Sequence, residues 1–269
     1  MSMSRKDIGV INAKGRGKEA NEDYHFGTGG QLFGGHDVHF LVIADGMGGH
    51  SNAESASHHA VESQEKWWND TIAASSGIQE VIEAFENEQM DEFRRLNQEL
   101  IDMGSKDDVK MGTTLSTVLV IDNMYMIHHV GDARVYRYSF SNNGREETSE
   151  LDGLRGLVQL TEDHTLVNRK VSQGTISKEV SSSRRIAGVL TQCLGVKGEV
   201  QPFVTFGTIR DEDIIFLCTD GVYKAVKDEK LRSIIRGSSK KNAQDIVDLV
   251  YEEVKKSDFS DDICILLMK

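Results

Sequence analysis

Two apolar runs of this chain each end directly on an Asp-Gly pair, and this feature restricts the possible folds more than any other. Residues 39–44 (HFLVIA) precede Asp45-Gly46, and residues 214–219 (IIFLCT) precede Asp220-Gly221. Short apolar runs bounded by turn residues are typical of buried strands, and glycine lets the backbone turn sharply and approach a ligand closely. One such ending is usually only a turn. Its repetition favours a shared role in which rigid strand ends carry carboxylates to one site.

The composition is that of a globular protein whose partners are not polyanions. The chain has 269 residues, of which 38% are hydrophobic and 28% charged, and we predict one domain over residues 1–269. The 31 basic and 43 acidic residues give a net charge of −12, which argues against nucleic-acid binding because phosphates require a basic surface. No apolar run approaches the roughly 18 residues of a membrane span, and the first residues are polar, unlike a secretory leader. We therefore expect a cytoplasmic protein without a membrane partner.

Several segments are predicted to be strands from their apolar or alternating pattern. Most are joined by short polar turns, such as Asp122-Asn123, and such turns favour antiparallel hairpins over crossover connections. The predicted strands cover residues 8–12, 39–44, 114–121, 124–130, 134–138, 158–160, 203–207, 213–218 and 263–268.

Helical periodicity is strongest between Ile78 and Ile101. Apolar residues recur there at intervals of three and four, which places them on one face of a helix. Long helices in adjacent pairs, with blocks of strands between them, favour an α+β fold whose sheets are covered by helices on their outer faces. The predicted helices cover residues 53–68, 78–101, 166–173, 228–235 and 242–255.

Acidic residues recur beside the predicted strands. Carboxylate and carbonyl oxygens suit Mg²⁺ or Mn²⁺, whereas the lack of clustered cysteine or regularly spaced histidine argues against zinc. Two such ions, about 3.5 to 4 Å apart, can share a bridging hydroxide and hold a phosphoryl oxygen during in-line displacement. Each aspartate alone could equally begin a turn or cap a helix, but the joint pattern favours a metal centre. The acidic positions are Glu22, Asp23, Asp45, Asp132, Asp163, Asp220 and Asp261.

A series of short motifs, taken in order, resembles the metal-dependent protein phosphatases of the protein phosphatase 2C type, especially their bacterial branch. The resemblance implies a central β-sandwich of two antiparallel sheets flanked by helix pairs. It also implies hydrolysis of phosphoserine and phosphothreonine in proteins by direct attack of a metal-bridging hydroxide. The motifs are Asn21-Glu22-Asp23, Ala44 to His50, Met111 to Thr114, His129 to Arg134, Leu160 to His164, Leu190 to Gly195, Cys218 to Val222 and Asp261-Asp262-Ile263.

The resemblance assigns the acidic residues to two catalytic ions, Mn²⁺ or Mg²⁺. Asp45 would bridge both ions. The Gly46 carbonyl, with Glu22 nearby, would serve one of them, and Asp220 with Asp261 would serve the other. Two alternatives keep the same fold: a catalytically weak module that binds phosphoproteins, and a hydrolase of small phosphate esters.

Further roles also follow only from the resemblance. Asp23 would orient a metal-bound water. In bacterial members, a third and looser ion is held by residues that correspond to Asp132 and Asp220, here joined by Asp163. The substrates would be phosphorylated proteins, the targets of a serine/threonine kinase.

The chain departs from the family pattern where the substrate phosphate is bound. Family members usually place an arginine five residues before the second acidic residue of the Glu-Asp pair, and this chain has Lys18 there. Lysine supplies charge without the planar fork of a guanidinium, so phosphate should be held more loosely. Arg16 could reach the phosphate instead, because Gly15 and Gly17 flank it, or both cations could be solvated loop charges.

Two other places differ from the pattern or carry an open interpretation. The final motif usually reads Asp-Asn, whereas here it is Asp261-Asp262. Spacing favours Asp261 as the ligand, with the reverse assignment still open. Residues 164–192 correspond to a flap near the active site in the family, and Arg184-Arg185 within it could either contact an acidic phosphopeptide or form a solvated basic turn.

Overall fold

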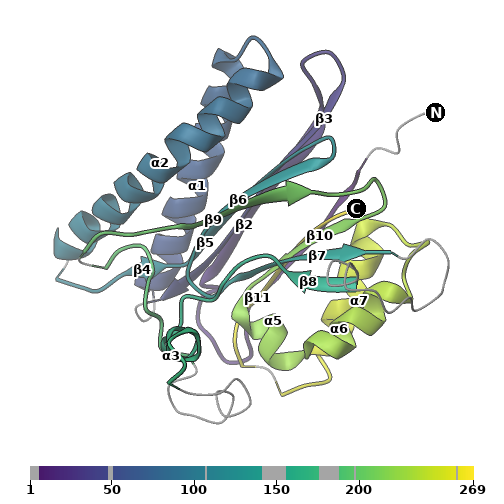
Figure 1. Ribbon diagram of the computed structural model, residues 1–269. Helices are drawn as coiled ribbons and strands as arrows, with labels where there is room; N and C mark the ends of the chain where they lie inside the picture. The colour runs from purple at the N-terminus through teal and green to yellow at the C-terminus, as the bar shows by residue number, and fades with distance from the viewer. Residues whose placement is uncertain are drawn as a thin grey trace.

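The computed structural model describes residues 6–47, 51–106, 108–140, 156–175, 188–196, 198–258 and 260–269. Two antiparallel sheets face each other, and helices cover the outer face of each (Figure 1). This four-layer arrangement confirms the predicted α+β sandwich flanked by helix pairs. None of the helices in these ranges is long and apolar enough to cross a bilayer.

The first sheet has the strand order β1-β11-β10-β7-β8, with every neighbouring pair antiparallel. Its two central strands, β11 and β10, are completely buried. Strands buried on both faces read as continuous apolar runs, which is why the sequence pattern identifies them well. The strands are β1 (Ile8–Ala13), β7 (Arg134–Ser139), β8 (Gly156–Gln159), β10 (Ile214–Cys218) and β11 (Ile263–Met268).

The second sheet has the order β2-β3-β5-β6-β9, again antiparallel, and the short strand β4 pairs with β3 beside this path. Tight hairpins join β2 to β3 and β5 to β6. The strands are β2 (Asp23–Leu32), β3 (His36–Met47), β4 (Gly112–Thr113), β5 (Leu115–Ile121), β6 (Met124–Val130) and β9 (Phe203–Thr208).

The long helices α1 and α2 lie on the outer face of the second sheet, and α5, α6 and α7 lie beside the first (Figure 1). A shorter helix, α3, follows β8. The helices are α1 (Ser51–Ala74), α2 (Ile78–Lys106), α3 (Leu166–Ser172), α5 (Asp220–Ala225), α6 (Asp228–Arg236) and α7 (Ala243–Val254).

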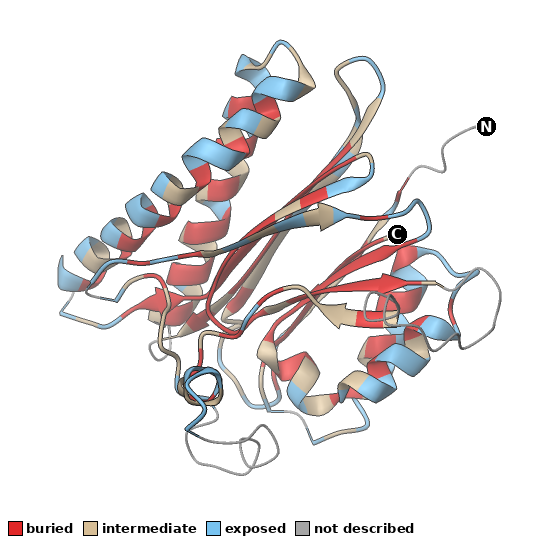
Figure 2. Cartoon of the chain, viewed as in Figure 1, coloured by how far each residue is buried: buried red, intermediate tan, exposed pale blue. Residues whose placement is uncertain are grey.

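Alternation along β3 builds two of the three core layers at once. Phe40 and Val42 pack toward the helices, where Phe40 stacks on Trp68 at 5.0 Å between ring centroids. Leu41 and Ile43 point the other way, into the layer between the sheets. Each fully buried side chain of this size stabilises the fold by roughly 1.5–3 kcal/mol. Figure 2 shows that buried residues lie on the inner sides of the helices and strands. Because its side chains pack into core clusters on both sides, β3 is held from both faces.

The predicted strands and helices are found, and the structure adds β2, β4 and α5. The glycines of β2 hide its strand character, because strand prediction treats glycine as a turn residue. They are needed for packing instead. A Cβ on Gly29 would lie 2.0 Å from the ring of His39 on β3, and one on Gly27 would lie 3.1 Å from Leu266 of the opposite sheet. Pleated strands accept glycine where a neighbour approaches closely.

Candidate functional site

The acidic ends of strands from both sheets meet at one edge of the sandwich. In the second sheet, Asp23 at the start of β2 lies directly opposite Asp45 on β3. From the first sheet, Thr219 donates its hydroxyl to the Asp23 carboxylate at 2.7 Å. The same hydroxyl accepts the amide of Cys264 on β11 at 3.0 Å, and Asp220 follows Thr219 in the chain. One threonine therefore fastens the two sheets together within the site.

Lys18 lies inside a cage of three carboxylates. Its Nζ is 2.8 Å from Glu22 Oε2, 2.7 Å from Asp261 Oδ1 and 3.0 Å from Asp262 Oδ2. Burial lowers the pKa of Lys18, but its hydrogen bonds to these carboxylates more than compensate, so that the net pKa lies above the ordinary lysine value. A cation is thus already stabilised at the position where the acidic residues converge.

Asp45 lies at the centre of the negative charge. Burial raises the pKa of its carboxyl well above the ordinary value, and repulsion from Asp23, Asp220, Asp132 and Asp261 raises it further, in that order. Repulsion of this kind requires the carboxylates to share one region of low dielectric. Such a cluster is stable as ions only when cations compensate it.

The donor set fits a hard divalent ion, although its members do not yet form a coordination sphere. Among the described residues, no three His, Cys, Asp or Glu side chains already stand in a metal-binding arrangement. The ammonium groups of Lys18 and Lys224 hold oxygens of Glu22, Asp220 and Asp261. A donor set made only of oxygens is suited to Mg²⁺ or Mn²⁺.

Gly46 is required by close packing. A Cβ at this position would lie 2.1 Å from the Ala53 carbonyl oxygen of α1 and 2.8 Å from the Glu22 carbonyl oxygen. The Gly46 amide donates to that Glu22 carbonyl at 2.9 Å, which ties the two predicted ligand positions together. The rest of the glycine-rich motif, residues 48–50, lies outside the described residues.

Two threonines that the sequence analysis did not single out hold the backbone of Asp45. The Asp45 amide donates to Thr114 Oγ1 at 2.9 Å, and the Asp45 carbonyl accepts the Thr113 hydroxyl at 3.0 Å. The Thr114 amide also donates to the Asp45 carbonyl at 2.9 Å. The Gly-Thr-Thr motif therefore positions the aspartate, in addition to leading into β5.

Asp261 and Asp262 have clearly different surroundings. The Asp262 side chain is almost completely buried and accepts the Gly15 amide at 2.7 Å and the Glu22 amide at 2.8 Å. The Asp261 side chain is 43% exposed and lies beside Lys18 and Lys224. Because its oxygens are used by backbone amides, Asp262 takes the structural position, which favours Asp261 as the ligand.

The two candidate phosphate-binding cations are placed differently. The side chain of Lys18 is 26% exposed and lies in the carboxylate cage. That of Arg16 is 74% exposed and faces Asp258, which is 97% exposed, at 3.5 Å. The geometry favours Lys18. Of the predicted flap, residues 164–175 and 188–192 are described, whereas Arg184-Arg185 lies outside the described residues.

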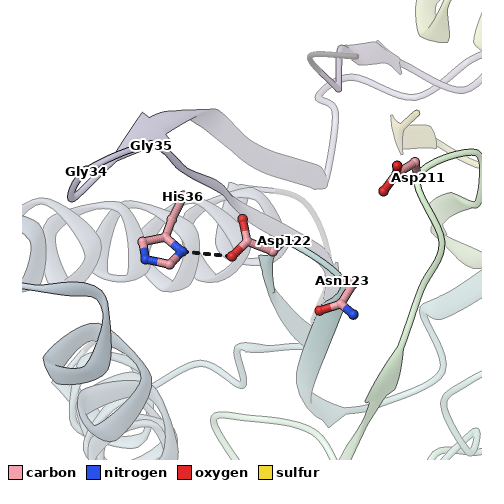
Figure 3. Close-up of a pocket in the computed structure, with 6 residues that line it drawn as sticks. All are labelled: Gly34, Gly35, His36, Asp122, Asn123 and Asp211. Atoms are coloured by element: carbon pink, nitrogen blue, oxygen red, sulfur yellow. Dashed lines mark hydrogen bonds and ion pairs between the residues drawn. The ribbon is translucent and has the colours of Figure 1, made fainter. Parts of the chain in front are cut away.

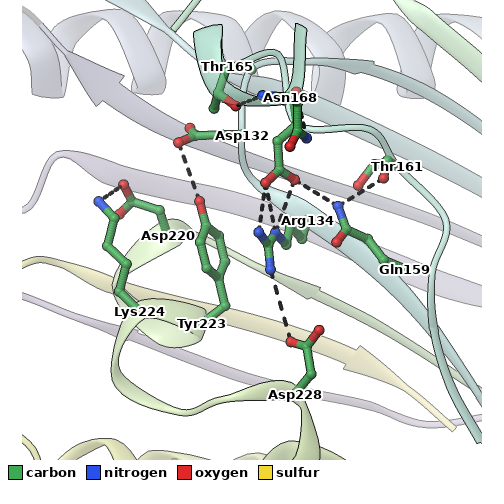
Figure 4. A network of polar contacts seen from close by, with 12 residues as sticks. Asp132, Arg134, Gln159, Thr161, Thr165, Asn168, Asp220, Tyr223, Lys224 and Asp228 are labelled. Carbon is green, nitrogen blue, oxygen red and sulfur yellow. Dashed lines mark hydrogen bonds and ion pairs between the residues drawn. The ribbon is translucent and has the colours of Figure 1, made fainter. Parts of the chain in front are cut away.

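Asp132 lies two residues before β7 and faces Tyr223 (Figure 4), and Asp163 is close enough to act on its charge. Burial raises the pKa of Asp132 to about 6, with further contributions from Asp220 and Asp163. Asp163 forms an ion pair with Arg134, with Nη2 2.7 Å from Oδ2. The structure therefore brings Asp132 and Asp220 into mutual repulsion but engages Asp163 with a cation of its own.

A cavity of 530 Å³ lies at the opposite end of the sandwich (Figure 3). It is formed by the β2–β3 and β5–β6 hairpin tips, and His36 Nδ1 lies 2.7 Å from Asp122 Oδ2 in its wall. Since β3 runs from His36 to Met47 at about 3.3 Å per residue, this cavity is roughly 30 Å from the acidic cluster. It contains none of the predicted site residues. Its lining residues are Gly34, Gly35, His36, Asp122, Asn123 and Asp211.

Comparison with known sequences finds phosphatases along nearly the whole chain. The family described as Stage II sporulation protein E (SpoIIE) matches residues 177–269. The serine/threonine phosphatase stp of Listeria welshimeri is 29% identical over 257 residues, which cover 95% of this chain and 92% of that protein.

Comparison with solved structures gives the same fold. The serine/threonine phosphatase Stp1 from Staphylococcus aureus superposes with a TM-score of 0.80 at 22% identity, covering 98% of this chain and 95% of that chain. The catalytic domain of the serine threonine protein phosphatase PstP, in complex with two manganese ions, gives a TM-score of 0.72 at 22% identity, covering 98% and 97%. These similarities confirm the predicted fold.

Proposed function

We propose that this chain is a metal-dependent phosphatase of the protein phosphatase 2C type that hydrolyses phosphoserine and phosphothreonine in proteins. The observation that carries this proposal is the meeting of Glu22, Asp45, Asp220 and Asp261 at one edge, where lysine ammonium groups are held between acidic side chains. Mn²⁺ or Mg²⁺ bound there would activate water and neutralise charge that develops on the phosphoryl group.

Five positions would hold two ions. Asp45, at the centre of the charge, would contact both. The Gly46 carbonyl and Glu22 would hold one ion, and Asp220 with Asp261 the other. The rigid strand ends that carry these groups keep them from collapsing onto one another, because β3 is packed on both faces and Asp45 is held by threonines. Preorganisation of this kind lowers the reorganisation that accompanies reaction.

Asp23 would orient the attacking water. Burial raises the pKa of its carboxyl well above the ordinary value, although the hydrogen bond from Thr219 partly opposes this. A carboxylate of raised pKa is the better proton acceptor at neutral pH. We assign to Asp23 the orientation of the attacking water, with Thr219 fixing the direction of its carboxylate.

Lys18 would bind the substrate phosphate once divalent ions take over its carboxylate partners. Its ammonium already lies at the site, and its loop is pressed against the segment that precedes β11: a Cβ on Gly15 would be 2.5 Å from the Ser260 carbonyl oxygen. A single ammonium contacts phosphate as a point charge, without the bidentate geometry of arginine. We therefore expect a looser hold on substrate than an arginine would give.

The substrates would be phosphoproteins made by a serine/threonine kinase. We further propose that residues 1–269 act as one cytoplasmic catalytic domain, with residues 164–192 as a flap near the substrate and no nucleic-acid or membrane partner. Serine/threonine phosphatases among the relatives support the substrate class.

The test is turnover of a phosphothreonine peptide by the purified chain with Mn²⁺, with Mg²⁺ and with excess chelator. Activity that requires the added ion is expected. Binding of the peptide without metal-dependent turnover would favour the phosphoprotein-binding module. Faster turnover of a sugar phosphate than of the peptide would favour a hydrolase of small phosphate esters.

A further inference from the structure

The three residues expected to hold a third ion all have partners within the protein (Figure 4). Asp163 has both oxygens engaged: Arg134 Nε donates to Oδ1 at 3.0 Å, and Nη2 donates to Oδ2 at 2.7 Å. Gln159 Nε2 donates to Oδ1 at 2.7 Å. A buried bidentate pair of this kind is costly to break, because either charge left alone would be unpaired in low dielectric. Asp163 is therefore engaged by Arg134 and does not offer a free carboxylate to an ion.

Asp132 is held on one side by Tyr223, whose hydroxyl donates to its Oδ2 at 3.3 Å. The guanidinium of Arg134 stacks over the Tyr223 ring, 3.7 Å from the centroid. The ring is thus fixed between the two charged groups. A cation–π contact with a desolvated guanidinium is a favourable interaction, so Tyr223 keeps its position beside Asp132.

Lys224 brings a positive charge to the same place. It lies one helical turn after Asp220 on α5, and its ammonium forms an ion pair with the Asp220 carboxylate. Helix geometry alone accounts for that pair. It does not account for the second contact, because Lys224 Nζ is also 4.0 Å from Oδ2 of Asp261, which precedes β11. The ammonium therefore lies between carboxylates from two separate segments.

We propose that the Lys224 ammonium is a resident cation that takes the place of a third divalent ion, so that this chain binds two exchangeable ions. This inference rests on the two-ion site proposed above. An ammonium has donors and no lone pair, so it cannot serve as a ligand, and it repels a divalent ion placed beside it. With Asp163 bound to Arg134, the carboxylates left for a third ion are Asp132 and Asp220. Lys224 is paired with Oδ2 of Asp220, and its charge also acts on Asp132. The second ion keeps Oδ1 of Asp220 and the carboxylate of Asp261, whose 4.0 Å separation from Lys224 is longer than a hydrogen bond.

The experiment is equilibrium dialysis of the purified full chain against Mn²⁺, with the number of bound ions counted per chain. We expect two ions for the wild type. Lys224→Asp replaces the cation by an oxygen donor and is expected to bind three. Lys224→Arg keeps the positive charge and is expected to bind two.

The matched control is Lys227→Asp, which makes the same change of charge at an exposed position three residues later and is expected to leave two ions bound. Lys224→Asn serves as a second test should the aspartate variant fail to fold by circular dichroism; it should also bind three ions, the third more weakly. Three ions bound to the wild type would overturn the role of Lys224. So would two ions bound to both Lys224→Asp and Lys224→Asn when these are folded. Either result would leave the two-ion site intact. Fewer than two ions on the wild type would overturn the proposed function and this inference together.

Discussion

Lys18 shows how one side chain can serve two states of a site. Without divalent ions, its ammonium neutralises three carboxylates that would otherwise repel one another. In the two-ion site proposed above, divalent ions would take over Glu22 and Asp261, and the ammonium would become available to phosphate. The same electrostatic attraction explains both roles, because the ammonium moves toward the anion whose charge is not neutralised by another cation: the carboxylates in one case and the phosphate in the other.

Replacement of Lys18 tests the second role. Lys18→Ala should raise KM for a phosphopeptide about tenfold or more and change kcat less, because a charge-assisted hydrogen bond contributes roughly 1.5–3 kcal/mol, here mainly to binding. Lys18→Arg should restore KM. Steady-state kinetics at saturating Mn²⁺ measures both constants, and a loss confined to kcat would exclude a role in substrate binding. Arg16→Ala is the control and should change neither constant.

Asp220 is the acidic residue whose loss should stop catalysis. Asp220→Asn removes the charge of a predicted ligand while keeping nearly the same shape, so turnover should fall by at least 100-fold with the fold retained. The comparison variant is Asp258→Asn, because Asp258 is fully exposed and away from the cage. Full activity of purified Asp220→Asn would refute its assignment as a ligand.

At the scale of elements, the positions of the proposed metal ligands depend on how the strands are joined to each other. Asp45 is held by the residues that join β4 to β5, since Thr114 and Thr113 contact its amide and carbonyl. Thr219 performs the same task between the sheets. Hydroxyl groups suit these positions because one hydroxyl can both donate and accept.

Thr114→Val should lower the free energy of unfolding by about 1–3 kcal/mol, because the side-chain acceptor of the Asp45 amide is lost. Thr117→Val is the matched control on the neighbouring strand, where the buried hydroxyl has no hydrogen-bond partner among the described residues. That control should be neutral or stabilising. Urea denaturation of both variants measures the difference, and equal values would show that the bond to Asp45 contributes nothing.

At the scale of the whole molecule, folding stability and ion binding are linked through the acidic cluster. Burial raises the pKa of Asp45, and repulsion from the neighbouring carboxylates raises it further, so both effects oppose folding of the ion-free chain with Asp45 ionised. Ions that bind only the folded state stabilise it by about 2.7 kcal/mol per site at 100 times Kd. Mn²⁺ should therefore raise the free energy of unfolding by more than ionic screening of surface charges alone would.

Asp45→Asn separates the two contributions. Without ions, the variant should melt a few degrees above the wild type at neutral pH, since about 1 kcal/mol changes Tm by roughly 2–4 °C in domains of this general size. It should also lose most of the Mn²⁺-dependent rise in Tm. Thermal melts with Mn²⁺ and with chelator give both values. A wild-type Tm unaffected by Mn²⁺ would contradict the linkage.

Much of the fold could be predicted because local pattern and burial coincide. The apolar runs of β10 and β11 and the periodic face of α2 fit those elements closely. Strand β2 could not be predicted, because its glycines are set by close contacts with His39 and with the opposite sheet, whereas local sequence preference assigns glycine to turns. Helix α5 could not be predicted either, because its first residues, Asp220-Gly221, are typical of a turn and the helix has only six residues.

The amino-acid sequence by itself determined which acidic residues lie at the ends of strands. Because those residues supply only oxygen donors, it also indicated the kind of ion and the kind of chemistry that they suit. Only the tertiary structure decided which partners those groups have. Asp262 accepts hydrogen bonds from two backbone amides. Asp163 forms an ion pair with Arg134, and Lys224 lies 4.0 Å from Asp261. The physical reason is distance. Hydrogen bonds and ion pairs act over a few ångströms between atoms that the sequence separates by tens or hundreds of residues, so their partners exist only after the two sheets have packed.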